Sequence, residues 1–242
     1  MPKKSLIFIL PALPSLDESD SYMVPFIQQF IIGFKDNYPN ITIIIYTLYS
    51  PKGNTYLWRN IEVIPLNFKK GRSFLKLFYL INSILKISKK IKKNNVVGLL
   101  SFWYTETAMI GNMIGFFKSI KHYTWLQGQD VKRSNKYMLF FPPNPNKLIA
   151  LSNFQNEYLY KEFGFYASTV NTISINSSFF PELNTSSRAI DIIGIGSLIP
   201  LKNFQLFLNV ILKLKKKNPK IRAVIVGNGP LEKKLETFCI SK

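Results

Sequence analysis

The chain has 242 residues, of which 47% are hydrophobic, and its formal net charge is +19 at pH 7. This length and apolar content are typical of a folded protein of one or two domains and exclude a disordered chain. The single cysteine and single histidine exclude an intramolecular disulfide and argue against a zinc site or a Cys/His nucleophile pair.

The basic charge leaves several interpretations open. It suits nucleic acid or an anionic membrane surface, and it also follows from codon bias, since Lys, Ile and Asn are all abundant. The sequence has no zinc-finger spacing, aromatic RNP pattern or glycine-rich KH loop, so no nucleic-acid partner is expected. It has no signal-peptide pattern and no run of about 18 apolar residues, so no transmembrane helix is predicted.

Apolar runs alternate with helical periodicity along the first 176 residues. Strands are predicted at 6–10, 41–46, 61–65, 96–100, 122–126, 148–151 and 170–175. Helices are predicted at 23–34, 73–93, 105–117 and 153–163. The last helix has Ser152 or Asn153 as its N-cap and ends at Gly164. Because strands and helices alternate, we expect an α/β fold with a parallel sheet.

The longest predicted helix, 73–93, is both basic and amphipathic. Its expected apolar stripe consists of Phe74, Leu77, Phe78, Ile81, Ile84, Leu85 and Ile91. In one interpretation this stripe packs on the sheet and the lysines lie in water. In the other, the helix is a membrane surface that meets anionic lipid. The lysines of that surface are Lys86, Lys89, Lys90 and Lys93.

Polar residues follow two of the predicted strands. Gln127-Gly128-Gln129-Asp130 comes after strand 122–126, and Glu106 comes shortly after strand 96–100. Asp130 can orient a hydroxyl or cap a helix, and Glu106 can face a ligand or stabilise its helix through the dipole. His122 begins a strand, so we expect a structural role for it.

The stretch 190–235 predicts a strand, a loop, a helix, a second strand and a glycine-rich loop. The apolar runs 190–195 and 223–226 lack alternation, as in strands buried on both faces. Asn203 is the expected N-cap of the helix. This is a βαβ unit, and ligands bind at the carboxyl ends of such strands. A dinucleotide site is disfavoured, because Ile199 occupies the third glycine position and no acid ends the second strand.

The motif order in this stretch carries a family resemblance. The segments GIGSLIPLKNFQLFL and KNPKIRAVIVGNGPLEKKLE resemble the donor half of group 1 (family 4) retaining glycosyltransferases, which are two-domain GT-B enzymes. The resemblance implies a Rossmann-like acceptor-side domain at 1–176, a linker at 177–188 and a partial donor domain at 189–242. It also implies that the donor domain is truncated, with roughly 120 residues and the family's glutamate pair lying beyond this sequence.

The resemblance also assigns site residues. Lys202 is expected beside the donor diphosphate, where a cation stabilises the charge on the leaving phosphate. The rest of that site is expected at Ser197, Gly196, Gly227, Asn228 and Gly229. Ser197 stands where the family often has Arg.

The loop at 127–130 resembles the family's His-Gly-x-Asp element. This implies catalytic roles for Asp130 and Gln127 and acceptor-side roles for Gly128 and Glu106. Gln127 replaces the usual His, and glutamine can hydrogen-bond but cannot shuttle a proton.

The function implied is transfer of a hexose-type sugar, with retention, from a nucleotide-sugar to a glycan or lipid-linked acceptor. No cofactor or metal is expected besides the nucleotide-sugar co-substrate. The alternative is a non-catalytic module that binds a glycan or a membrane surface. The cytoplasm is the expected compartment, and peripheral attachment to the inner face of the membrane stays open.

Overall fold

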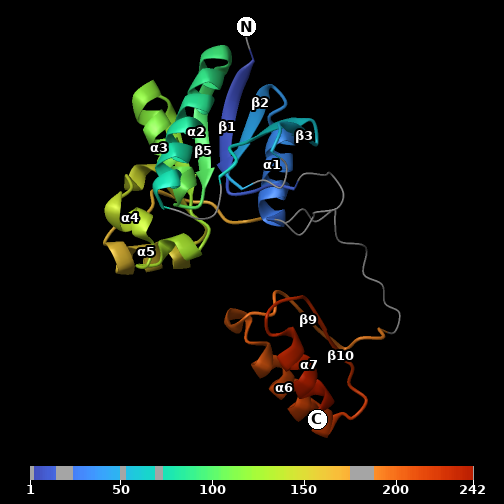
Figure 1. Cartoon of the computed structure of the whole chain (residues 1–242). Coiled ribbons are helices and arrows are strands. Elements are labelled where there is room, and N and C mark those ends of the chain that lie inside the picture. Colours follow the sequence, from blue (N-terminus) through green and yellow to red (C-terminus); the bar gives the residue numbers. More distant parts are fainter. Residues whose placement is uncertain (1–2, 15–23, 50–52, 69–72, 175–187, 242) are drawn as a thin grey trace. The chain divides into compact units, whose positions relative to one another are not determined.

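The computed structural model describes residues 3–14, 24–49, 53–68, 73–174 and 188–241, with the side chains of residues 73 and 74 excepted. The chain divides into two compact units, Met1–Ser177 and Ser178–Lys242 (Figure 1). This division lies one residue from the domain end predicted at 176. The predicted linker, 177–188, lies outside the described residues except for Arg188.

The first unit is built on an eight-stranded sheet with the strand order β3-β4-β2-β1-β5-β6-β7-β8. Its strands are β1 (Lys4–Leu10), β2 (Ile41–Thr47), β3 (Tyr56–Trp58), β4 (Ile61–Pro65), β5 (Asn95–Phe102), β6 (Lys121–Trp125), β7 (Leu148–Ala150) and β8 (Thr169–Val170). Its helices are α1 (Pro25–Asn37), α2 (Ser73–Lys93), α3 (Glu106–Lys118), α4 (Lys136–Phe140) and α5 (Asn153–Phe163).

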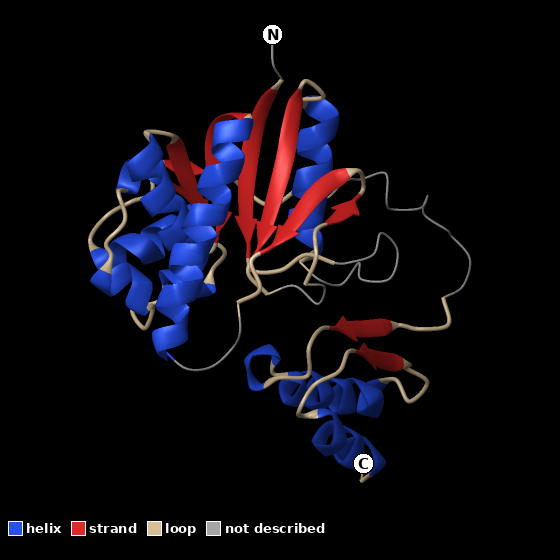
Figure 2. Ribbon diagram, turned by 45° about the horizontal axis from the view of Figure 1, so that its top comes forward, coloured by secondary structure: helices blue, strands red, loops and turns tan. Residues whose placement is uncertain are grey.

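Helices cover both faces of the sheet, as Figure 2 shows. Successive side chains of a strand point to opposite faces, so β1 contributes to two cores. Ile7 and Ile9 pack with buried residues of α2 and α3, while Phe8 and Leu10 pack with buried residues of α1. Each of these four side chains of β1 is 1% exposed or less. The α/β architecture predicted from the sequence is therefore confirmed for this unit, and its strands other than β3 pair in parallel.

One strand at the edge of the sheet was not predicted. β3 pairs with β4 in antiparallel register, so the sheet is not parallel throughout. The two residues between these strands, Arg59 and Asn60, have φ angles of 47° and 59°. Positive φ at both central positions is the signature of a type I′ hairpin turn. The turn was not predicted from the sequence, because Arg-Asn stands where type I′ turns commonly have Asn-Gly.

The strand predicted at 170–175 is much shorter in the structure. β8 comprises only Thr169 and Val170, and residues 171–174 form neither helix nor strand. Both residues of β8 lie at the exposed edge of the sheet, where little packing favours extending the strand. The helix predicted before it is confirmed, since Ser152 caps α5 through Gln155 N and Gly164 ends it at a φ of 80°.

The apolar stripe predicted for α2 is correct only in part. Ile84 and Ile91 pack against the core. Leu77, Phe78, Ile81 and Leu85 are instead 63%, 63%, 50% and 56% exposed. The described side chains that α2 buries are Ile87 and Ser83, which are 0% and 1% exposed. Apolar residues occupy more of the helix circumference than the sheet and α3 can cover.

The second unit is a small βαβ arrangement. β9 (Ile192–Ile195) and β10 (Ala223–Val226) form a parallel two-stranded sheet. The helices α6 (Phe204–Lys217) and α7 (Glu232–Ile240) enclose a core with it. The buried residues of this core are Leu198, Phe204, Leu208 and Leu235.

The two strands of this unit are not buried on both faces, contrary to the sequence prediction. Ile193 and Ile195 of β9 are 52% and 72% exposed, and Val224 and Val226 of β10 are 37% and 48% exposed. Ile225, which alternates with the two valines, packs on the core with the helices. Among the described residues, helices therefore cover one face of this sheet only.

Candidate functional site

Asp130 joins two loops at the carboxyl ends of β5 and β6. It lies in the short 3₁₀ helix η1 (Gln129–Val131) and is 4% exposed. Its carboxylate accepts hydrogen bonds from the backbone N–H groups of Tyr104, at 2.9 Å, and Gln127, at 3.0 Å. Burial raises the pKa of Asp130, and these N–H donors oppose that rise. The geometry makes Asp130 the support of the loop that carries Gln127.

Gln127 holds a buried acceptor oxygen on that loop. Its side-chain nitrogen Nε2 donates to Trp125 O at 3.3 Å. Its oxygen Oε1 has no hydrogen-bond donor among the described residues. Buried polar atoms are normally satisfied, so this unpaired oxygen is an exception among the described residues. Gly128, with a φ of 110°, provides the backbone turn that follows.

Glu106 lies in the first turn of α3 as part of a polar cluster. Its side chain is 10% exposed and its Oε1 lies 3.3 Å from Nζ of Lys76 on α2. The pKa of Tyr137 is raised by burial first and by the nearby Glu106 carboxylate second. The sequence pattern did not predict Lys76 and Tyr137 as partners, because they lie far from Glu106 along the chain.

His122 lies in a buried network beneath α3. Its Nε2 is 2.7 Å from Oγ of Ser101 and its Nδ1 is 2.9 Å from Oδ1 of Asn112. This arrangement has the connectivity of a catalytic triad. However, Ser101 and His122 are 0% and 1% exposed, which excludes a substrate. Burial and the charge of Lys147 lower the pKa of His122 to about 3, so the imidazole is neutral and structural, as expected from the sequence.

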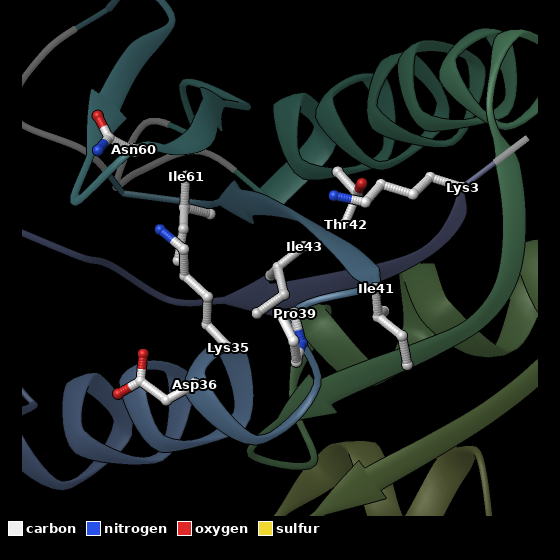
Figure 3. Close-up of a pocket in the computed structure, with 9 residues that line it drawn as sticks. All are labelled: Lys3, Lys35, Asp36, Pro39, Ile41, Thr42, Ile43, Asn60 and Ile61. Atoms are coloured by element: carbon white, nitrogen blue, oxygen red, sulfur yellow. The ribbon is translucent and has the colours of Figure 1, made fainter.

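A pocket of about 470 Å³ lies at the amino ends of the strands in the first unit's sheet, opposite to Asp130 and Gln127. Figure 3 shows its lining, with Lys35 and Asp36 on α1 and Ile41 at the start of β2. Nζ of Lys35 donates to Arg59 O at 2.7 Å. Ligands of open α/β sheets bind at the carboxyl ends of the strands, and this pocket is at the amino ends.

The second unit brings the predicted donor-site loops into direct contact. Gly196 N donates to Val226 O at 3.0 Å, and Leu198 N donates to Asn228 O at 2.8 Å. Ser197 and Asn228 are both exposed beside this contact. The backbone of the two loops thus forms one continuous rim at the carboxyl ends of β9 and β10.

Glycine is required where these loops touch. A Cβ atom added to Gly227 would lie 1.9 Å from Gly196 O. A Cβ added to Gly229, whose φ is 154°, would lie 2.7 Å from Leu198 O. The glycine pattern that resembles a phosphate site therefore also has a structural cause, because no side chain fits between the loops.

Lys202 and the start of α6 complete this rim. Lys202 ends the 3₁₀ helix η4 (Pro200–Lys202), and its side chain lies near Gly196. It is exposed and forms no ion pair within the described part of the chain. Asn203 occupies the N-cap position of α6, but its backbone is left-handed and its side chain accepts no capping hydrogen bond, contrary to our prediction. The first N–H groups of α6 therefore lack a side-chain cap.

Two lysines of the predicted membrane surface of α2 have partners within the protein. Nζ of Lys86 donates to Pro65 O at 2.7 Å, and burial lowers the pKa of Lys86. Nζ of Lys90 lies 2.6 Å from Oε2 of Glu62. Lys89 and Lys93 are exposed. Lys86 and Lys90 reach the sheet because they project from the sides of α2 next to the strand β4.

The described residues contain neither a membrane span nor a metal cluster. None of the helices in this part of the chain is long and apolar enough to cross a bilayer. The described His, Cys, Asp and Glu residues form no group of three or more that could hold a metal ion.

No protein-family model and no curated protein sequence matches this chain. Solved structures do match its fold. Against a point mutant of S. aureus TarM, in complex with fondaparinux, α-GlcNAc-glycerol and UDP, the TM-score is 0.63 at 12% identity, covering 100% of this chain and 75% of that one. Against the apo lipopolysaccharide outer core galactosyltransferase WaaB, the TM-score is 0.53 at 12% identity, covering 98% and 71%.

A third neighbour has a different activity. Against the UDP-GlcNAc 2-epimerase of Neisseria meningitidis bound to UDP-GlcNAc, the TM-score is 0.50 at 16% identity, covering 92% of this chain and 64% of that one. The chain thus spans between 64% and 75% of the length of these three neighbours. The shared property is the fold, so the GT-B-like α/β class expected from the sequence is confirmed.

Proposed function

We propose that this chain is a glycosyltransferase that uses a nucleotide-sugar donor and a glycan or lipid-linked acceptor. The observation that carries the proposal is the rim of the second unit. Two loops at the carboxyl ends of β9 and β10 are joined through their backbones, beside an exposed Lys202 and a helix start without a side-chain cap. A cation and a helix N-terminus without a side-chain cap, at one sheet edge, suit a diphosphate.

The chemistry follows from the charge that develops during transfer. The bond between the anomeric carbon and the diphosphate breaks, and the nucleoside diphosphate leaves with the electron pair. The acceptor oxygen forms the new bond, and its hydroxyl proton passes to the leaving diphosphate. Lys202 would stabilise the growing negative charge more in the transition state than in the ground state. We propose retention and a hexose-type sugar on the family resemblance described above.

We place the acceptor at the carboxyl edge of the first unit. Gln127, which is half-buried on the loop at this edge, would contact an acceptor hydroxyl. Asp130 would act as a positioning residue, since its carboxylate is occupied by backbone N–H groups. Gly128 and the Glu106 cluster would shape the same edge. The proposed compartment is the cytoplasm, in keeping with the exposed free thiol of Cys239.

Titration calorimetry with UDP-, GDP- and ADP-sugars tests the donor site. We expect one of these donors to bind, and Lys202→Ala to weaken its affinity by about tenfold, through the loss of one charge-assisted contact. Lys217→Ala is the matched control, because Lys217 is also exposed but lies at the opposite end of α6. Equal affinities for both variants would contradict the diphosphate role of Lys202.

The runner-up is a non-catalytic module that binds a glycan or a membrane. The observation in its favour is the small size of the second unit, which has two described strands. A radiolabelled sugar-transfer assay separates the two functions, because the module would bind a glycan without moving label onto it. Absence of heat with all three donor classes, together with glycan binding, would favour the module.

A further inference from the structure

The outward side of α2 is apolar at one end and basic at the other. The outer face of α2 is defined here by the exposed residues Leu77, Phe78, Ile81, Leu85, Lys89 and Lys92. At 100° per residue, the last five of these lie within an arc of about 80°. The face thus runs from apolar to cationic over about four turns of helix.

This apolar exposure is unusual for a protein surface. Phe78 is 63% exposed and Leu85 is 56% exposed, while the buried side of α2 already supplies Ile87 to the core. Single exposed apolar residues are normal, but a contiguous set on one helix face marks an interaction surface.

The charge of α2 determines what this face can meet. The helix contains Lys76, Lys86, Lys89, Lys90, Lys92 and Lys93, and no acidic residue. Among the described residues, the acids that pair with α2 are Glu62, with Lys90, and Glu106, with Lys76, both on its inward sides. No acid of the described residues forms an ion pair with a lysine of the outer face. Positive charge next to apolar side chains is the pattern of a helix that lies in the interface of an anionic bilayer.

We propose that the outer face of α2 docks on an anionic phospholipid surface, with its apolar half inserted among the lipid tails and Lys89 and Lys92 against the headgroups. This differs from the surface predicted from sequence, since Lys86 and Lys90 are engaged with the protein. It does not depend on the proposed transferase activity, because bilayer docking requires neither donor nor acceptor.

Vesicle sedimentation with the full chain tests this docking. The vesicles are phosphatidylcholine alone and phosphatidylcholine with one third phosphatidylglycerol. We expect binding to the anionic vesicles only, and weaker binding at high salt. The triple variant F78Q/I81Q/L85Q should bind at least about tenfold more weakly, because it loses apolar insertion. The triple variant K89Q/K92Q/K93Q should bind up to about a hundredfold more weakly, because it loses headgroup attraction.

Controls separate this surface from the general basic charge. K213Q/K216Q/K217Q removes three exposed lysines from α6, and F154Q removes a phenylalanine that is 82% exposed on α5. Both should bind as the unchanged chain does. All variants should retain their far-UV circular dichroism, since each changes exposed residues.

Three outcomes would overturn the proposal. The first is no binding of the unchanged chain to anionic vesicles. The second is equal loss of binding in the α6 control and in the α2 lysine variant. The third is a concentration-dependent dimer, seen by sedimentation equilibrium without vesicle binding, that F78Q/I81Q/L85Q abolishes; that result would assign the face to a second copy of the chain.

Discussion

At the scale of single residues, Asp130 shows how one carboxylate sets the shape of a loop. It is nearly fully buried and accepts N–H donors from two different loops. Replacing it with alanine would leave the N–H groups of Tyr104 and Gln127 without acceptors. We expect Asp130→Ala to lower the unfolding free energy by roughly 1–3 kcal/mol for each donor left unsatisfied. Urea denaturation measures this loss.

Asp130→Asn is the informative comparison for that variant. Asparagine keeps one acceptor oxygen of similar position, so it should retain part of the stability that alanine loses. If alanine and asparagine are both as stable as aspartate, the carboxylate does not hold the two loops together. A catalytic role for Asp130 would instead appear as lost transfer without lost stability.

His122 makes stability depend on pH. Its pKa is about 3 in the folded chain and 6.5 ordinarily, so between these pH values the unfolded state binds more protons than the folded state. The unfolding free energy should therefore fall as the pH drops from 6.5 towards 3. His122→Gln should have a smaller pH slope over this window, measured by urea denaturation at several pH values. An unchanged slope in the variant would show that other groups cause the effect.

The residues of the candidate sites were partly predictable from the sequence. Gly227, Gly229 and Lys202 belong to a local motif, and their positions at a sheet edge follow from strand order. The partners of Glu106 were not predictable, because Lys76 and Tyr137 reach it only through the packing of α2 and α4. Local patterns predict which loop carries a site, while the contacts between loops depend on tertiary structure.

At the scale of elements, the contact between the two loops of the second unit gives a sharp test. Gly227→Ala would place a methyl group 1.9 Å from Gly196 O, so the loops must separate. We expect this variant to lower the melting temperature of the second unit and to increase proteolysis within it. Limited proteolysis with mass spectrometry locates the effect.

Gly33→Ala is the matched control for this substitution. Gly33 lies inside α1, and a Cβ added there meets nothing within 4 Å. Since alanine is about 1 kcal/mol better than glycine in a helix interior, this change should leave the chain as stable or more stable. Equal destabilisation by both substitutions would contradict the steric account of Gly227.

Errors in the predicted elements have a common physical cause. Helix bounds were predictable from caps and periodicity, as with Ser73–Lys93 and Asn153–Phe163. The face that α2 buries was not predictable, because this helix is apolar around much of its circumference. The hairpin at Arg59-Asn60 was missed because its turn depends on backbone angles that the residue types do not usually signal.

At the scale of the whole molecule, alternation of strands and helices was enough to predict the fold class. It could not predict that both strands of the second unit have an apolar face in contact with solvent. A run such as Ile192–Ile195 is typical of a strand covered on both sides. How many helices cover a sheet is a property of the assembled layers, which a local pattern does not contain.

The open side of the second unit also determines how this chain behaves at high concentration. Within the described residues β9 and β10 pair only with each other, so each has an unpaired edge beside its exposed isoleucines or valines. Such strands are templates for intermolecular sheet growth. Colloidal repulsion from a net charge of +19 opposes this growth in dilute buffer. High salt screens that repulsion, so precipitation during salt-based purification would start at these two four-residue strands.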